Sequence, residues 1–110
     1  MKRFTASELW EKEWFLNLNP RLKLFWIYLT MRCDCAGVWE PNFPLASFMI
    51  GDKVSEKDMK EFDDKILLLA NGKWWLTKFI GFQYGELSES CPAHKPIFKS
   101  IHKNGLKSKK

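Results

Sequence analysis

The chain has 110 residues, 45% of them hydrophobic, with a formal net charge of +5; this allows one domain with a real core and excludes an intrinsically disordered chain. Its apolar runs, such as residues 66–70, are far shorter than the ~20 residues that span a bilayer, and no signal-peptide stretch follows Lys2 and Arg3, so we expect no membrane partner. The same features favour the cytoplasm, where three cysteines, an odd number, argue against a disulfide framework and for reduced thiols or metal ligands.

The first half of the chain predicts helices separated by clear breaks. Ser7 can cap a first helix that carries Trp10, Trp14 and Phe15 on one side. Asn19 as cap and Pro20 at the first helical position open a second helix. An apolar stripe at helical spacing marks its core face: Leu22, Phe25, Trp26 and Leu29.

A short strand and two short helices are predicted next. Val38-Trp39-Glu40 reads as a strand that Pro41 ends. Asn42 can cap a third helix that stops at Gly51, the residue type favoured just past a helix end. Ser55 caps the fourth helix, and Asp58 nearly completes a capping box. The positions expected to face inward are Met59, Phe62 and Ile66.

A β-hairpin is the strongest local prediction. Asn71-Gly72 is a two-residue step between two apolar runs, 65–70 and 73–79. Residues 80–87 are expected to be extended, because Gly81 and Gly85 flank their aromatic side chains. Pro92 begins a last helix. The fold class is therefore α+β, a winged helix-turn-helix of three to five helices with a small antiparallel hairpin wing, over residues 1–91. Residues 92–110 form a basic helix and tail packed on this domain or extending from it.

All of the excess positive charge lies in residues 92–110, which hold six lysines and no acid. The remaining 12 basic and 13 acidic residues give a net charge of −1. A basic segment is the usual electrostatic footprint of a protein that binds phosphate backbones or acidic partners. The alternative is a solvated terminus with no partner.

The candidate DNA contacts lie on the hairpin and the last helix, with two lysines on the fourth helix. In the fourth helix three lysines oppose five acids, which disfavours base readout by a groove-inserted helix. One of the two hairpin tryptophans should face outward, where it can stack on an unpaired base, unless both are packing residues. The candidate residues are Lys57, Lys60, Lys73, Trp74, Trp75, Lys78, Lys95, Lys99 and Lys103.

A structural zinc site is a second hypothesis. Two close pairs, Cys33 with Cys35 and Cys91 with His94, supply four ligands of the right type. Such a site would tie the end of the second helix to the start of the last. The alternative is three small thiols, buried or half-buried, and a surface histidine.

No enzymatic motif is present: the chain has no P-loop, no dinucleotide-binding glycine pattern and no nucleophile elbow, so we expect neither catalysis nor a small-molecule substrate.

Three segments, residues 33–40, 71–75 and 79–89, resemble the N-terminal winged-helix domain of phage and prophage replication initiation proteins, the DnaD-like replisome organisers. The resemblance implies a DNA-binding and assembly role in starting replication, in the cytoplasm of a bacterial host. The alternative is a protein-interaction module that self-associates or docks a replication partner without direct DNA contact.

Overall fold

Two short helical pieces, η1 (Ser7–Glu11) and α1 (Glu13–Leu16), open the part of the chain that this computed structural model describes, residues 7–106. The prediction of one continuous first helix is wrong, because Lys12 has extended backbone angles. The break lets the Trp10 ring pack edge-on against the buried Phe15 at 5.0 Å. In an unbroken helix residues five apart are not surface neighbours.

α2 (Pro20–Arg32) forms as its sequence predicts. The Asn19 side chain accepts a hydrogen bond from the Leu22 amide at 2.9 Å, and Pro20 occupies the first turn. All four residues of the predicted apolar stripe are buried: Leu22, Phe25, Trp26 and Leu29. This helix supplies the central ridge of the core.

The segments that follow α2 are β1 (Val38–Trp39), α3 (Phe43–Ile50) and η2 (Glu56–Lys65). The predicted caps of α3 are confirmed: the Asn42 side chain accepts from the Leu45 amide, and Gly51 ends the helix with left-handed angles. The capping box of Ser55 and Asp58 is present at the start of η2. However, η2 is a 3₁₀-helix and is kinked at Asp63.

The kink places Asp63 at φ 55° and ψ −135°, a backbone conformation that favours glycine. We expect Asp63→Gly to raise the free energy of unfolding by about 1 kcal/mol, because relieved strain outweighs the extra entropy of glycine in the unfolded chain. Asp64→Gly is the matched control and should lower it by about 0.5 to 1 kcal/mol. Urea unfolding followed by tryptophan fluorescence measures both, and equal effects of the two changes would contradict the strain argument.

The predicted β-hairpin is confirmed, with a different loop. β2 (Ile66–Leu68) and β3 (Trp74–Leu76) pair antiparallel, and the Leu69 amide donates to the Lys73 carbonyl at 2.8 Å. Three residues, 70–72, therefore form the loop, and Gly72 takes φ 87°. The Asn71 side chain instead accepts from the Lys73 amide at 3.0 Å, which fits a three-residue loop rather than a two-residue one.

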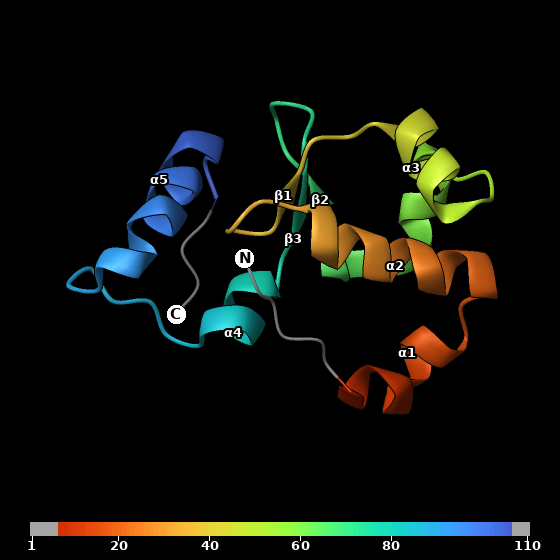
Figure 1. The fold of residues 1–110 in the computed structure, drawn as a ribbon, viewed down its shortest axis with the longest axis horizontal. Helices are drawn as coiled ribbons and strands as arrows, with labels where there is room; N and C mark the ends of the chain where they lie inside the picture. Colours follow the sequence, from red (N-terminus) through yellow and green to blue (C-terminus); the bar gives the residue numbers. More distant parts are fainter. Residues whose placement is uncertain (1–6, 107–110) are drawn as a thin grey trace.

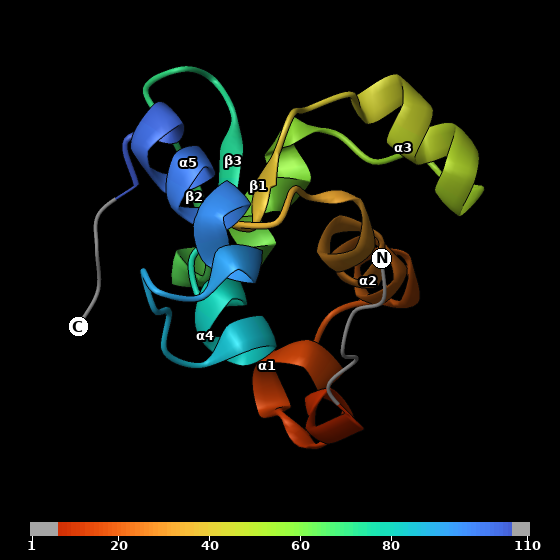
Figure 2. The same ribbon diagram turned by 60° about the vertical axis from the view of Figure 1, so that its left-hand side comes forward.

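β3 lies between β1 and β2 in the three-stranded antiparallel sheet. Neighbouring residues on a strand point to opposite faces, and here each face of β3 packs into a core. One face joins the main core, which contains Trp39, Ile66 and Leu76 and is closed by α2 and η2. The other face carries a second core, built from Ala36, Val38, Trp75, Ile97 and Leu106. Figure 1 and Figure 2 show α5 (Lys95–Asn104) on the side of the sheet away from α2.

The prediction that residues 80–87 are extended is wrong. α4 (Phe79–Tyr84) occupies most of this segment and ends at Gly85, and a single 3₁₀ turn, η3 (Pro92–His94), leads into α5. Gly81 costs a helix about 1 kcal/mol relative to alanine. Burial of Phe79 and the hydrogen bond from the Tyr84 hydroxyl to the Cys35 carbonyl, 2.7 Å, offset that cost.

Among the helices of residues 7–106, none combines the length and the apolar character that crossing a membrane requires.

Candidate nucleic-acid interface

α5 presents a row of lysines to solvent because its other face is held in the second core. Pro96 lies in its first turn and Gly105 ends it at φ 66°. Ile97 is 2% exposed and Ser100 is also buried. The lysines spaced four residues apart on the opposite side are all exposed: Lys95, Lys99 and Lys103. Residues 92–106 contain no acid, so no carboxylate on α5 neutralises this row.

A chain of polar contacts fixes α5 to the rest of the domain. The Ser100 hydroxyl donates to Asp34 Oδ2 at 2.6 Å, and the Asn104 amide donates to the Ser100 carbonyl at 2.9 Å. The Asn71 amide at the hairpin loop donates to Asn104 Oδ1 at 3.0 Å. The C-terminal end of α5 is therefore tied to the hairpin loop, and Lys103 lies one residue from that link.

The hairpin and the turn that follows it contribute two lysines but no exposed tryptophan. Lys78 is exposed and Lys73 is half-buried. Trp75 is buried in the second core, and its indole N–H donates to the Ala36 carbonyl at 3.2 Å. Trp74 is partly buried against the main core. Both tryptophans are therefore packing residues, which is the alternative stated from the sequence, and neither faces outward as a free stacking platform.

The lysines of η2 lie in an acidic setting. Lys57 and Lys60 are exposed, but so are the neighbouring acids Glu56, Glu61, Asp63 and Asp64. Arg21 of α2 forms an ion pair with Asp58 at 2.8 Å, so this cation is turned inward. The negative sum over η2 disfavours its approach to phosphates.

The structure does not assemble the predicted zinc ligands. Within the described residues no three His, Cys, Asp or Glu side chains form a group that could hold a metal ion. Tyr84 lies between the two predicted pairs: its hydroxyl bonds to the Cys35 carbonyl, and its ring packs on His94 at 5.9 Å. His94 Nδ1 already accepts a hydrogen bond from the Ser88 amide at 3.0 Å. Cys33 is buried and bonds to the Thr30 carbonyl.

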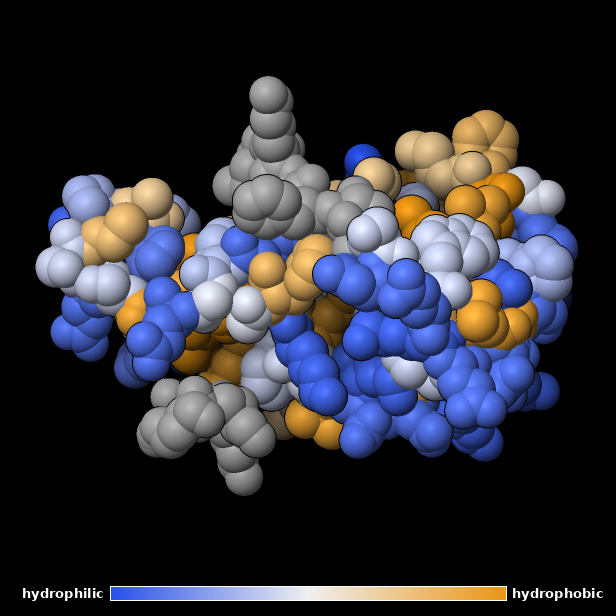
Figure 3. Space-filling model, turned by 90° about the horizontal axis from the view of Figure 1, so that it is seen from below, coloured by the Kyte–Doolittle hydropathy of each residue, from blue (hydrophilic) through white to orange (hydrophobic). Residues whose placement is uncertain are grey.

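An apolar groove of about 1430 Å³ runs between β2, α4 and α5. Its exposed apolar side chains include Leu67, Leu68 and Phe82, each close to half exposed. Figure 3 shows hydrophobic surface in a recess on the α5 side of the molecule, bordered by hydrophilic residues. A second exposed apolar patch is the outer face of α3, where the Phe48 side chain is 80% exposed.

Sequence reasoning missed Asp34, Ser100 and Asn104, which position α5. An aspartate just before a glycine turn is a typical sign of a side chain that bonds forward to the backbone, and Asp34 precedes Gly37 by three residues. Nothing local in the sequence pairs Ser100 with it, since the two are 66 residues apart. The terminal lysines Lys107, Lys109 and Lys110 lie outside the described residues.

Comparisons of the chain with protein-family models, with curated proteins and with solved structures found no match. The described surface carries three chemical features on which a function can be argued. α5 carries regularly spaced cations, η2 carries a surplus of acids, and an apolar groove lies beside α5.

Proposed function

We propose that this chain is a winged-helix domain. The order of its elements supports this fold: a helix, α2, a strand, β1, two helices joined by a short turn, α3 and η2, and then the β2–β3 hairpin as the wing. The pairing of β1 with β3 supplies the third strand of the small sheet.

We propose that the domain binds the phosphate backbone of DNA, without sequence preference, through α5 and the hairpin. The observation that carries this proposal is the row of exposed lysines on a helix docked against the sheet, with no acid in residues 92–106. Cations at fixed positions on a rigid helix favour a polyanion and release its counterions. Together with the resemblance of residues 33–40, 71–75 and 79–89, this supports a role in the replication initiation of a phage or prophage.

η2 takes no part in base readout in this proposal. In the order of elements it stands where a winged helix has its recognition helix, but it contains three lysines and five acids and so has a net negative charge. A recognition helix reads bases from within the major groove, where phosphates of both strands surround it. Binding therefore runs through the opposite side of the sheet, where α5 lies.

Fluorescence-anisotropy titrations of labelled single- and double-stranded DNA at about 50 and about 200 mM salt test the proposal. Phosphate contacts by the three exposed lysines of α5 alone predict that this change in salt weakens binding about 40-fold for double strands and about 20-fold for single strands. The variant Lys95→Gln/Lys99→Gln/Lys103→Gln should lose most of this salt dependence and bind at least about tenfold more weakly at low salt. Substitution is preferred to truncation, because removing α5 would uncover Trp75 and Val38.

The matched control is Lys53→Gln/Lys57→Gln/Lys60→Gln, which removes the same charge from exposed lysines at and before η2. It should retain binding within about threefold of the unmodified chain. Thermal unfolding checks that both variants fold. If the two variants lost the same amount of affinity, the loss would reflect the net charge of the chain and not the position of the lysines, which would contradict a site on α5. The proposal would be overturned if the folded, unmodified chain did not bind DNA at low salt.

A protein-interaction function is the second candidate, favoured by the apolar groove beside β2 and by the exposed Phe48 and Met49 of α3. Exposed apolar side chains gathered on one face are typical of interfaces. In this case self-association or docking of a replication protein replaces direct DNA contact. Sedimentation of the unmodified chain over a range of concentrations, beside the DNA titrations, separates the two candidates.

A further inference from the structure

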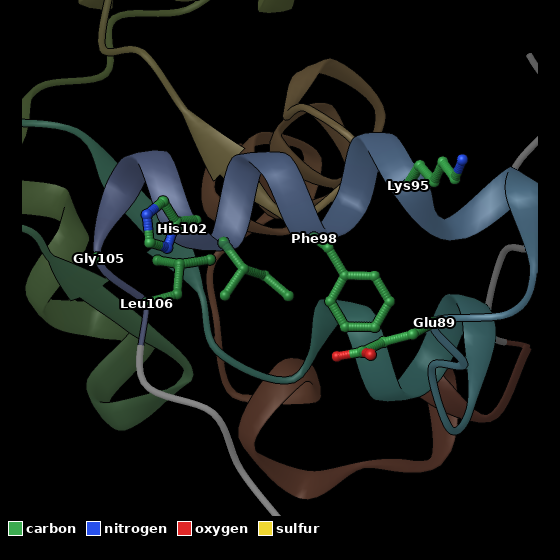
Figure 4. Close-up of a pocket in the computed structure, with 7 residues that line it drawn as sticks. Glu89, Lys95, Phe98, His102, Gly105 and Leu106 are labelled. Atoms are coloured by element: carbon green, nitrogen blue, oxygen red, sulfur yellow. The ribbon is translucent and has the colours of Figure 1, made fainter.

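A shallow, open hollow of about 710 Å³ lies beside the lysine row of α5. Its lining includes the apolar side chains of Phe98 and Ile101 and the polar residues His102 and Lys95. Figure 4 shows the Phe98 ring projecting from α5 toward the loop that carries Glu89. Phe98 is half-buried and lines the hollow, so part of its ring is open to a ligand there. An aromatic ring beside a row of cations is the arrangement that single-stranded nucleic-acid binders use for stacking.

The cationic row and the hollow lie next to each other on one helix. Lys95, Lys99 and Lys103 are spaced by about 6 Å along the axis, four residues at the rise of an α-helix, which is similar to the spacing of successive phosphates in one extended strand. Residues three and four apart on a helix are neighbours, so Phe98 and His102 border this row. A backbone that follows the lysines therefore brings its bases to the hollow.

Glu89 gives the hollow a polar group suited to a base. Its carboxylate lies beside the Phe98 ring in Figure 4 and lines the hollow. A carboxylate repels phosphate but accepts a hydrogen bond from the exocyclic amino group of cytosine. Thymine offers an oxygen at the same place and would meet the carboxylate unfavourably.

We infer that the hollow beside Phe98 receives an unpaired base of a single-stranded nucleic acid whose phosphates lie along Lys95, Lys99 and Lys103. This inference rests on the proposed binding to DNA and adds the preference for single strands. Bases in an intact duplex are stacked and paired, so they cannot enter the hollow without the cost of flipping. Cytosine is the favoured pyrimidine because its exocyclic amino group can donate a hydrogen bond to Glu89.

The test compares oligo(dC), oligo(dT) and a duplex of equal length by fluorescence anisotropy at low salt, with the full chain. Phe98→Leu should weaken binding of oligo(dC) about 5- to 20-fold and leave duplex binding within about twofold, because it removes the stacking ring but keeps an apolar side chain. Phe82→Leu is the matched control, an exposed aromatic on α4 that does not line the hollow. It should leave both affinities unchanged.

The second measurement needs no change at Phe98 and therefore stands even if that variant fails to fold. The unmodified chain should prefer oligo(dC) over oligo(dT) by about 5-fold or more, and Glu89→Gln should bring that ratio close to one. The ratio is insensitive to the lost charge, which affects both strands alike. The base site would be overturned if the chain bound oligo(dC) and oligo(dT) equally and Phe98→Leu bound as tightly as the unmodified chain. If the duplex were still bound in that case, the proposal of backbone binding would stand. Absence of all binding at low salt would overturn both.

Discussion

Replacing Gly37 by alanine is expected to lower the free energy of unfolding by about 3 to 5 kcal/mol. Two effects add at this position. Its φ of 91° lies in the left-handed region that L side chains rarely adopt. In addition, a Cβ at residue 37 would lie 2.6 Å from the Cβ of Phe79, which is a buried residue of the main core and cannot move aside as the end of a flexible side chain can.

The start of α4 crosses Gly37, so relief of this clash must displace backbone. The Gly37 carbonyl also accepts a hydrogen bond from the Leu76 amide at 2.8 Å, which links the turn to β3. Movement away from Phe79 would weaken that link. The expected loss is a large part of the about 5 to 15 kcal/mol that holds a domain of this size together.

Gly51→Ala is the matched control for the clash. Gly51 has φ 88°, nearly the angle of Gly37, but a Cβ there would meet no atom within 4 Å. Its expected cost is about 1 kcal/mol, which is backbone strain alone. Urea unfolding followed by tryptophan fluorescence gives both values. If Gly37→Ala cost no more than Gly51→Ala, the start of α4 would be able to move away from residue 37 at little energetic cost, and the clash argument would be wrong.

Signals carried by a few neighbouring residues predicted α2, β1, α3 and the β2–β3 hairpin. Asn19, Asn42 and Gly51 act as caps wherever a helix begins or ends beside them, so their meaning does not depend on distant parts of the chain. α4 could not be predicted in this way. Gly81 and Gly85 argue for an extended segment, and only the distant contacts of Phe79 and Tyr84 make the helix stable.

The candidate interface shows the same division. The spacing of Lys95, Lys99 and Lys103 predicts a row on one helix face, and these lysines are exposed as expected. The alternation rule for Trp74 and Trp75 is also obeyed, since the two pack on opposite faces of the sheet. The positions of Trp74 and Trp75 in the sequence do not indicate that α5 covers one of those faces. For the same reason ligand type alone could not reveal that Tyr84 lies between Cys35 and His94.

Asp34→Ala is expected to cost about 2 to 4 kcal/mol of unfolding free energy and to loosen α5. Asp34 Oδ1 accepts hydrogen bonds from the Ala36 amide at 2.8 Å and the Val38 amide at 3.0 Å, while Oδ2 accepts from the buried Ser100. Alanine leaves all three donors without this acceptor. Asp34→Asn keeps an oxygen for the two amides and should cost about 1 kcal/mol, which makes it the matched control.

The loss at Asp34 should also reach the proposed interface, because Asp34 holds α5 through Ser100, and the Ala36 carbonyl beside it holds Trp75. In Asp34→Ala we expect red-shifted tryptophan emission and weaker DNA binding before global unfolding. A double-mutant cycle with Ser100→Ala isolates the link, and a coupling of about 1 kcal/mol is expected from residues in direct contact. Additive costs would mean that Asp34 stabilises only its own turn and that apolar burial of Ile97 and Leu106 alone positions the lysine row.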